Sequence, residues 1–382
     1  MTSLLRDRPA STPQMLAAFG DEALLKGALA FEAALARAGA VEGLIPTAAA
    51  DVIAAACASI EVDVATLADE AAHAGTLAIP LVRRLRERVS ATDPAAAEYV
   101  HRGATSQDLA DTALMLQARS GAALISTDAL AVGDALAALA ETYAETPMLG
   151  RTLLQAAQPI TLGLKAAGWM QGLEDARRRF EREATAAIRV QLGGPVGTLA
   201  GLTPRVADVM AADLGLAPAL PWHAQREAVA GLGASLAILV GALGKIAGDI
   251  ALMAQREVGE AFEPHVEGRG GSSSMPGKRN ATGCQIVLSA ALRAPGLASG
   301  LIAGLPQTHE RDLGGWQAEA PALATLFELT HGALAALRPV VEGLEIDTAA
   351  MARNLAAANV GADVGHAAEL TRSALAQRRR RD

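Results

Sequence analysis

A long segment without a helix breaker restricts the fold more than any other feature of this sequence. Residues 104–146 contain no proline and are rich in alanine and leucine. We therefore expect one helix that is capped by Thr105 or Ser106 and continues to about Glu145, before Pro147. The average helix in globular proteins has about 11–12 residues. A helix several times longer does not fit a compact small domain, and it indicates a long helical bundle.

The rest of the chain is consistent with such a bundle. Hydrophobic residues make up 51% of the sequence but aromatic residues only 3%, so the core must consist of small side chains, which favour closely packed helices. Further helices are expected at about 21–39, 48–58, 159–190, 227–255, 282–305 and 316–337. We predict an all-α fold with a small N-terminal helical domain (1–103), a central five-helix bundle (104–343) and a short C-terminal helical segment (344–382).

Charge, cysteine content and hydropathy narrow the classes of function. The net charge of −8 argues against nonspecific nucleic-acid binding. Two distant cysteines, Cys57 and Cys284, suggest no disulfide framework and fit a reducing cytoplasm, and the N-terminus lacks the apolar core of a signal peptide. The most apolar run, Leu232 to Met253, is broken by Lys245 and Asp249, so we interpret it as a buried bundle helix and not as a membrane span.

The segment from Gly268 to Asn280 is the strongest candidate for a functional site. It combines four glycines and three serines with Lys278, Arg279 and the closing asparagine. Such a loop can bring backbone N–H groups, hydroxyls and a cation against an anionic ligand. A plain flexible linker is the alternative, but linkers do not usually carry a Met-Pro pair flanked by such polar groups.

This loop reads G-S-S-x-M-P-x-K-x-N from Gly271 to Asn280, and it resembles the signature of the fumarase/aspartase superfamily. Two further polar segments, 101–108 and 150–159, resemble the other two regions that form the active site in that superfamily. The resemblance therefore covers essentially the whole chain. It implies a bundle of the fumarase/aspartase type and a homotetramer whose active sites are shared between subunits.

The amino-acid sequence of three further segments resembles the 3-carboxy-cis,cis-muconate cycloisomerase family within that superfamily. The segments 100–108, 222–226 and 309–319 carry this likeness. The adenylosuccinate and argininosuccinate lyases read G-R-T-H-x-Q in the second region, whereas this chain has Leu153 in place of the histidine, which supports a cycloisomerase. A superfamily lyase, such as adenylosuccinate lyase releasing fumarate by β-elimination, is the alternative. A non-catalytic scaffold conflicts with the intact serine loop.

The chemistry implied by this resemblance is the interconversion of a carboxylated muconate and its lactone through an aci-carboxylate intermediate. Ser272 is expected to move the proton, with Ser273 as the alternative base, and Lys278 is expected to stabilise the developing negative charge. A solvated surface lysine is the alternative for Lys278. No metal-ligand spacing and no nucleotide-binding motif is present, so neither a metal nor a cofactor is expected.

The small polycarboxylate substrate needs several polar contacts. Thr105 and Ser106 lie at the expected N-terminus of the long helix, where free N–H groups and the helix dipole favour an anion. Helix capping alone is the alternative role for these two residues. His223 and His309 are equally consistent with structural and ligand-binding roles. The residues expected to bind substrate carboxylates are His101, Thr105, Ser106, Gln107, Arg151, Thr152, Gln155, Asn280 and Arg311.

Overall fold

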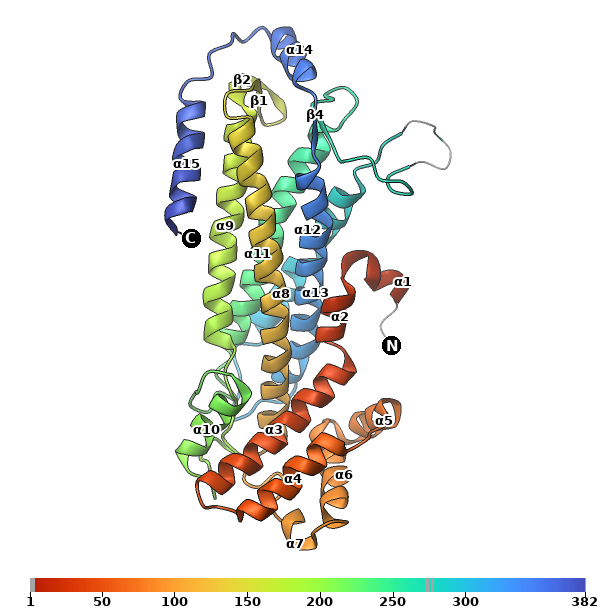
Figure 1. Cartoon of the computed structure of the whole chain (residues 1–382), viewed down its shortest axis with the longest axis vertical. Helices are drawn as coiled ribbons and strands as arrows, with labels where there is room; N and C mark the ends of the chain where they lie inside the picture. Colours follow the sequence, from red (N-terminus) through yellow and green to blue (C-terminus); the bar gives the residue numbers. More distant parts are fainter. Residues whose placement is uncertain (1–3, 272–274, 276–277, 382) are drawn as a thin grey trace.

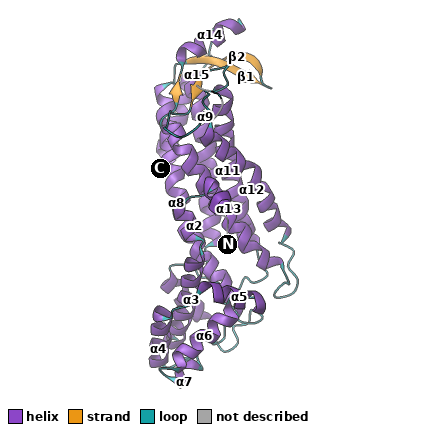
Figure 2. Ribbon diagram, turned by 90° about the vertical axis from the view of Figure 1, so that its right-hand side faces the viewer, coloured by secondary structure: helices purple, strands orange, loops and turns teal. Residues whose placement is uncertain are grey.

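A computed structural model describes residues 4–271, 275 and 278–381 as a long helical bundle with smaller groups of elements at its two ends (Figure 1). Five long helices run side by side through the molecule, as Figures 1 and 2 show. They are α8 (Ser106–Thr142), α9 (Leu162–Ala187), α11 (Glu227–Met253), α12 (Thr282–Ala303) and α13 (Gly315–Glu342). The all-α fold with a long central helical bundle, expected from the sequence, is confirmed.

The N-terminal elements lie around the lower half of the bundle in Figure 1. Two short helices and a 3-10 turn come first and lie against the bundle, and Met15 is part of its core. Six helices form the lower end, where α3 contacts both α10 and α8. These elements are α1 (Leu4–Asp7), η1 (Arg8–Ala10), α2 (Pro13–Ala18), α3 (Asp21–Val41), α4 (Thr47–Ser59), α5 (Val64–Ala74), α6 (Ala78–Ser90), α7 (Pro94–Ala97) and α10 (Pro204–Leu214).

The upper end of the bundle carries two small antiparallel ribbons and the C-terminal helices (Figure 1). One ribbon is a hairpin that directly follows α8, and the other pairs a segment before the serine-rich loop with a segment after α13. The last helix returns along α9. These elements are β1 (Pro147–Thr152), β2 (Gln155–Thr161), β3 (Ala261–Phe262), β4 (Glu345–Ile346), α14 (Thr348–Ala358) and α15 (Ala367–Arg381).

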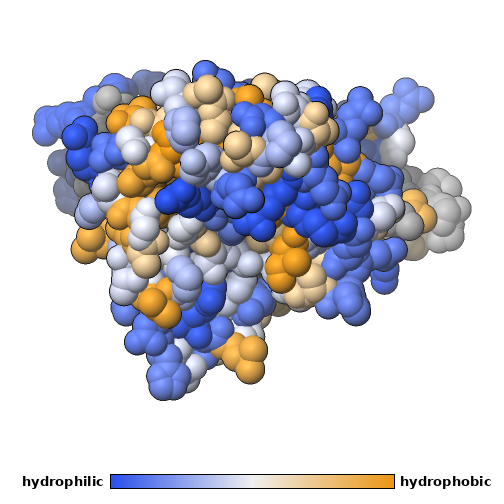
Figure 3. All heavy atoms as spheres, turned by 90° about the horizontal axis from the view of Figure 1, so that it is seen from below, coloured by the Kyte–Doolittle hydropathy of each residue, from blue (hydrophilic) through white to orange (hydrophobic). Residues whose placement is uncertain are grey.

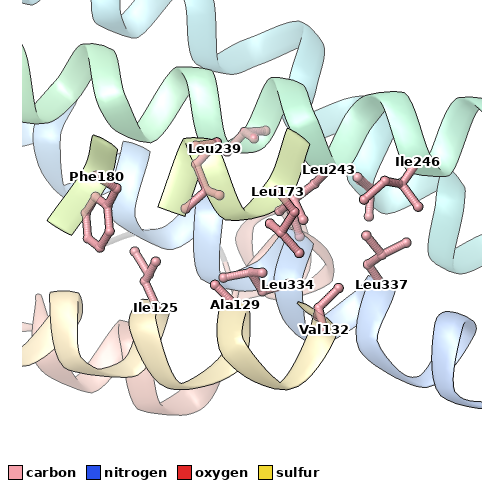
Figure 4. Packing of buried hydrophobic residues seen from close by; sticks show 14 of the residues in the cluster. Ile125, Ala129, Val132, Leu173, Phe180, Leu239, Leu243, Ile246, Leu334 and Leu337 are labelled. Atoms are coloured by element: carbon pink, nitrogen blue, oxygen red, sulfur yellow. The ribbon is translucent and has the colours of Figure 1, made fainter. Parts of the chain in front are cut away.

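The bundle core consists of interlocking small and branched side chains (Figure 4). In Figure 4, Ile125, Ala129 and Val132 of α8 face residues of α9, α11 and α13, such as Leu173 and Leu334, and all five side chains are fully buried. Residues four and three positions apart on α8 thus form one stripe, which is the pattern expected of a helix with one buried face. This packing explains how a chain with so few aromatic residues builds a large core.

Two helix boundaries predicted around prolines are wrong. Pro159 was expected to begin a helix, but it lies in β2, opposite Leu149, and the helix begins at Leu162 after Thr161 has capped it. Strand pairing with β1 accounts for this proline, because it occupies an edge position in a two-stranded ribbon. The last bundle helix was expected to close at Leu337, but it continues through Pro339 to Glu342.

Four helices in the described part of the chain are long and apolar enough to cross a membrane by length and composition: α8, α11, α12 and α13. In α11 and α13, 56% of the apolar window is buried inside the molecule, whereas in α8 and α12 only 28% is buried. The end of the molecule seen in Figure 3 shows hydrophilic residues interspersed with hydrophobic ones. Apolar surface therefore remains uncovered along α8 and α12.

Candidate active site

The first group of predicted site residues surrounds the N-terminus of α8. Arg311, from the loop between α12 and α13, donates a hydrogen bond of 2.6 Å from Nη1 to Oγ1 of Thr105. His101 lies in the turn before the helix with a φ of 60°, and its Nδ1 is 2.5 Å from a carboxylate oxygen of Glu32 on α3. Three segments that are far apart in the sequence thus meet where the free N–H groups of α8 favour an anion.

Glu32 also shifts the pKa of His101. Burial of the ring lowers the pKa of His101, but the adjacent Glu32 carboxylate outweighs burial and holds this pKa above its ordinary value. The ring is largely enclosed, and the contact between its Nδ1 and the fully buried Glu32 carboxylate fixes its position beside the start of α8.

Asp108 fixes the shape of the same region. Its carboxylate is fully buried and accepts four hydrogen bonds: from the N–H of Thr105 at 2.9 Å, from the N–H groups of Gly193 and Gly194 at 3.0 and 2.9 Å, and from Nε2 of His223 at 2.7 Å. One side chain thereby caps α8 and also binds the Gly193–Gly194 turn and the segment before α11 that contains His223. The contact with Asp108 gives His223 a structural partner inside the chain.

An ion network lies directly beneath this group, and sequence reasoning missed its centre, Arg226. The Arg226 side chain is 1% exposed, and its Nη1 and Nη2 donate to both carboxylate oxygens of Asp111 at 2.8 and 3.0 Å. Its Nε donates to Glu319 at 3.0 and 3.1 Å, and its guanidinium lies 4.6 Å from the ring centroid of Trp222. Arg226 therefore joins α8, α11 and α13 at the end where the first group lies.

Gln107 belongs to this interior network in the described structure. Its side chain is fully buried, and its Nε2 donates to the carbonyl oxygen of His223 at 2.9 Å and to Asp111 at 3.2 Å. Thr105, Ser106 and Arg311 are at least partly exposed at the surface of this end. Ser106 and His101 line a groove together with Arg86 of α6.

The second group lies on the β1–β2 hairpin at the opposite end of α8. Arg151 donates from Nη1 and Nη2 to the fully buried carboxylate of Glu260 at 2.9 and 2.8 Å, and Glu260 also accepts from Nδ2 of Asn354 at 2.8 Å. Arg151 thus fastens the hairpin to the segment before β3 and to α14. Thr152 and Gln155 are the last paired residues of the hairpin, and both are exposed.

The tip of this hairpin has an unusual backbone. The two turn residues, Leu153 and Leu154, have φ values of 50° and 64°. For a residue with a β-carbon, this left-handed conformation costs roughly 1–2 kcal/mol. Leu153 occupies the position where the lyases named above have a histidine, and a leucine side chain can neither donate nor accept a proton there.

The third group lies on the loop before α12. The backbone N–H of Asn280 donates to the carbonyl oxygen of Gly270 at 2.8 Å, which closes the base of the loop. Arg279 donates to Glu345 at 2.9 Å and to the carbonyl oxygen of Glu263 at 2.6 Å, and it lies over the ring of Phe262. Lys278 and Asn280 both line a cavity at this base. The two predicted serines, Ser272 and Ser273, lie outside the described residues.

The second and third groups are neighbours within the chain, but the first is remote. Glu260 holds Arg151, and Glu263, three residues later, accepts hydrogen bonds from the first N–H groups of α12 at Gly283 and Cys284. The first group lies at the start of α8 and the hairpin follows its end. Since α8 has 37 residues, it separates the two groups by roughly 55 Å. One chain alone does not bring all three groups together.

No set of three or more His, Cys, Asp or Glu side chains with a geometry suited to a metal ion occurs among residues 4–271, 275 and 278–381. Cys57 and Cys284 are both buried as free thiols, and burial raises the pKa of the Cys57 thiol to about 12. These two cysteines therefore offer no reactive thiolate near neutral pH.

Comparisons with known proteins agree with this fold and arrangement. Residues 8–296 match the model of the Lyase family. The chain belongs to this family, within the fumarase/aspartase superfamily. It is 44% identical over 359 residues to 3-carboxy-cis,cis-muconate cycloisomerase of Pseudomonas putida, which covers 93% of this chain and 85% of that protein.

Two further relatives help to define the branch. A crystal structure of 3-carboxy-cis,cis-muconate lactonizing enzyme from Pseudomonas putida has a TM-score of 0.88 and 40% sequence identity, covering 98% of this chain and 88% of that one. Nitrosuccinate lyase of Streptomyces davaonensis is 43% identical over 366 residues, covering 93% of this chain and 77% of that protein. The resemblance predicted from the sequence is confirmed.

Proposed function

We propose that this chain is a 3-carboxy-cis,cis-muconate cycloisomerase, an intramolecular lyase that interconverts 3-carboxy-cis,cis-muconate and its carboxymuconolactone in the protocatechuate branch of the β-ketoadipate pathway. The observation that carries the proposal is the 44% identity to a cycloisomerase over 93% of this chain. The leucine at position 153 gives independent support, because a lyase that relies on a histidine there would lack its proton-transfer group.

The reaction requires the site to stabilise one additional negative charge. In the direction of ring closure, a carboxylate oxygen adds to one carbon of a C=C bond, and the π electrons move into the conjugated carboxylate to give an aci-carboxylate. A proton then joins the α-carbon. In reverse, Ser272, or Ser273 as the alternative, removes this proton and the C–O bond breaks. Lys278 and Asn280 stabilise the aci-carboxylate, and no cofactor is needed.

The contacts within the chain divide the predicted substrate-binding residues into two kinds. Thr105, Ser106 and Arg311 form a carboxylate subsite at the N-terminus of α8, where partly exposed side chains meet the helix end. Thr152 and Gln155 form a second subsite on the hairpin. His101, Gln107 and Arg151 position these groups, since each is held by partners in the chain: Glu32, Asp111 with the His223 carbonyl, and Glu260, respectively.

The active sites are assembled from several copies in a homotetramer. The roughly 55 Å length of α8 supports this, because a single chain keeps its first and second groups apart. The apolar surface left uncovered on α8 and α12 also supports it, because association with other copies would remove that surface from water. We propose a cytoplasmic enzyme that binds neither membranes nor nucleic acids.

A β-eliminating lyase is the second candidate, and the 43% identity to a nitrosuccinate lyase favours it specifically. Both reactions share an aci-carboxylate and differ in whether the leaving group remains attached to the product. Adenylosuccinate lyase activity, the alternative from the sequence, has no better support than the cycloisomerase.

Incubation of the purified protein with 3-carboxy-cis,cis-muconate, nitrosuccinate and adenylosuccinate, each followed by ultraviolet absorbance, separates these candidates. We expect turnover of the muconate alone, and a loss of at least about a hundredfold in kcat for Ser272→Ala with the fold unchanged. Ser273→Ala is measured beside it, because Ser273 is the alternative base and the larger loss in kcat identifies which serine removes the proton. Turnover of nitrosuccinate or adenylosuccinate without turnover of the muconate would overturn the proposal.

A further inference from the structure

A groove between α6 and the start of α8 is lined in part by residues to which the proposed reaction gives no role. Its volume is about 440 Å³, within the range of about 300–1,000 Å³ that is typical of small-molecule sites. The turn before α8 contributes His101 to this groove, and α8 itself contributes Ser106. The other lining residues belong to α6: Ala78, Ile79, Val82, Arg83, Arg86 and Glu87.

The residues from α6 give the groove an apolar part and a charged part. Ala78, Ile79 and Val82 lie at the beginning of the helix, and the Ile79 side chain is 56% exposed although it is apolar. The charged residues follow within the next turn of the same helix, where residues three and four positions apart share a face. A groove with an apolar part beside a cation suits an organic anion that has a hydrocarbon chain.

The two arginines of the groove differ in how they are paired. Arg83 donates from Nη2 to Glu70 on α5 at 2.9 Å and from Nη1 to Glu87 at 3.4 Å, so an acidic side chain of the groove is already engaged. Arg86, in contrast, forms no ion pair with any residue in the described part of the chain, and its Nη2 donates to the carbonyl oxygen of Val100 at 3.2 Å. The charge of Arg83 is therefore compensated by ion pairs, whereas that of Arg86 is not.

The hydrogen bond to Val100 holds the Arg86 guanidinium near the start of α8. Val100 directly precedes His101 and is 1% exposed, so the accepting carbonyl belongs to a buried part of the turn. A guanidinium has five N–H donors in one plane, and this contact uses one of them. The other donors are left for a carboxylate in the groove, which Ser106 also lines.

We propose that Arg86 and Ser106 bind a further carboxylate of the substrate and make the site select a tricarboxylate over a dicarboxylate, an inference that rests on the proposed function. The subsite at the start of α8 then holds two carboxylates. Thr105 and Arg311 contact one of them, and Arg86 and Ser106 contact the other, because Thr105 and Ser106 are consecutive residues. Two adjacent carboxylates repel each other, so each needs a cation of its own.

The number of carboxylates on a ligand decides whether Arg86 contributes to its binding. A dicarboxylate can place one group at Thr105 and the other at a remote subsite, which leaves Arg86 in water. A tricarboxylate has one more group for the groove, and a guanidinium forms strong, charge-assisted hydrogen bonds with it. Arg86 therefore adds affinity for a tricarboxylate and little for a dicarboxylate.

Calorimetric binding of two ligands to the Arg86→Met variant tests this assignment. The ligand trans-aconitate is an unsaturated tricarboxylate, and cis,cis-muconate has the carbon chain of the proposed substrate without its 3-carboxylate. We expect the variant to bind trans-aconitate at least about tenfold more weakly than the wild type, and cis,cis-muconate within about twofold of it. Arg86→Lys keeps the charge but not the planar fork of donors, so it should bring trans-aconitate binding back to within about fivefold of the wild type.

Arg83→Met is the matched control, because Arg83 lines the same groove and carries the same charge but is paired with Glu70 and Glu87. Its binding of both ligands should stay within about twofold of the wild type, whereas a general effect of net charge would weaken both methionine variants alike. Circular dichroism checks the fold of each variant, and light scattering checks its oligomer mass. If Arg86→Met does not fold, Arg86→Gln, which keeps an N–H donor but no charge, must show the same selective loss.

Binding is measured without turnover, so the role of Arg86 and the proposed function can fail separately. If the wild type does not convert 3-carboxy-cis,cis-muconate but the selective loss in Arg86→Met is seen, the function is wrong and the role of Arg86 stands. Unchanged trans-aconitate binding by the neutral Arg86 variant, an equal loss in Arg83→Met, or an equal loss for cis,cis-muconate would overturn the assignment of Arg86. A wild type that binds trans-aconitate no more tightly than cis,cis-muconate would overturn it as well.

Discussion

Replacement of Arg226 by methionine removes the guanidinium at the centre of a buried ion network and tests how the end of the bundle is held together. The guanidinium is 1% exposed and donates to both oxygens of Asp111 at 2.8 and 3.0 Å and to Glu319 at 3.0 and 3.1 Å. Methionine keeps much of the side-chain volume and the contact with Trp222. It leaves two buried carboxylates without their partner.

The size of the effect follows from this geometry. Removal of one partner from a buried ion pair costs about 3–5 kcal/mol, because the remaining charge is buried and uncompensated. For a chain of 382 residues, whose unfolding entropy scales with length, this corresponds to a fall in melting temperature of about 4–6 °C.

The same network predicts a pH dependence for the variant. Burial already raises the pKa of Glu319 above its ordinary value, although Arg226 opposes it, and loss of the cation raises this pKa further. The folded variant then binds more protons than the unfolded chain, so its stability falls as the pH rises from 5.5 to 8.

Urea unfolding followed by tryptophan fluorescence and far-ultraviolet circular dichroism measures both effects at pH 5.5, 7 and 8. Arg338→Met is the matched control, because Arg338 is 44% exposed and pairs with Glu342 at the surface; it should cost less than about 1 kcal/mol at every pH. A loss of less than about 1 kcal/mol for Arg226→Met at pH 7, or the same loss at pH 5.5 and 8, would refute the reasoning.

Three further outcomes are expected. Glu32→Gln removes the carboxylate that raises the pKa of His101; the stability it costs through this pair should be fully seen below pH 6.5 and should vanish as the pH rises through the folded pKa, as pH-dependent urea unfolding measures. Gly163→Ala places a methyl group against the backbone that follows α8 and should destabilise by about 1–3 kcal/mol in the same assay. Mixing inactive Arg311→Met and Lys278→Met proteins, with subunit exchange, should restore about a quarter of the activity if sites are shared, whereas no recovery would place both residues in one chain's site.

The helical frame was predictable because its signals are local. The segment from Thr105 onward has a capping residue, an apolar stripe and no proline until 147, and α8 forms where these signals indicate. The hairpin was missed for a related reason. Its turn carries Leu-Leu in place of a glycine-containing pair, so no turn residue marks it, and Pro159 imitates a helix start.

The candidate site was predictable only in part, because its partners are distant in the sequence. The loop chemistry of Lys278 and Asn280 is visible in a short motif. The role of Arg226, in contrast, depends on its contacts with Asp111 and Glu319, which lie 115 and 93 residues away in the sequence. The pairing of Arg151 with Glu260 spans 109 residues and was equally hidden. Hydrophobic periodicity carries no information about such polar contacts.

Because α8 is unbroken, its length fixes the distance and the rotation between the residues at its start and the β1–β2 hairpin at its end. Each residue added to an α-helix moves everything beyond it by about 1.5 Å and turns it by about 100°. An insertion in the middle of α8 would therefore swing the hairpin to another side of the bundle, while an insertion in the loop before Pro94 would be absorbed locally. We expect the spacing between the start of α8 and the hairpin to tolerate substitutions but not changes in length.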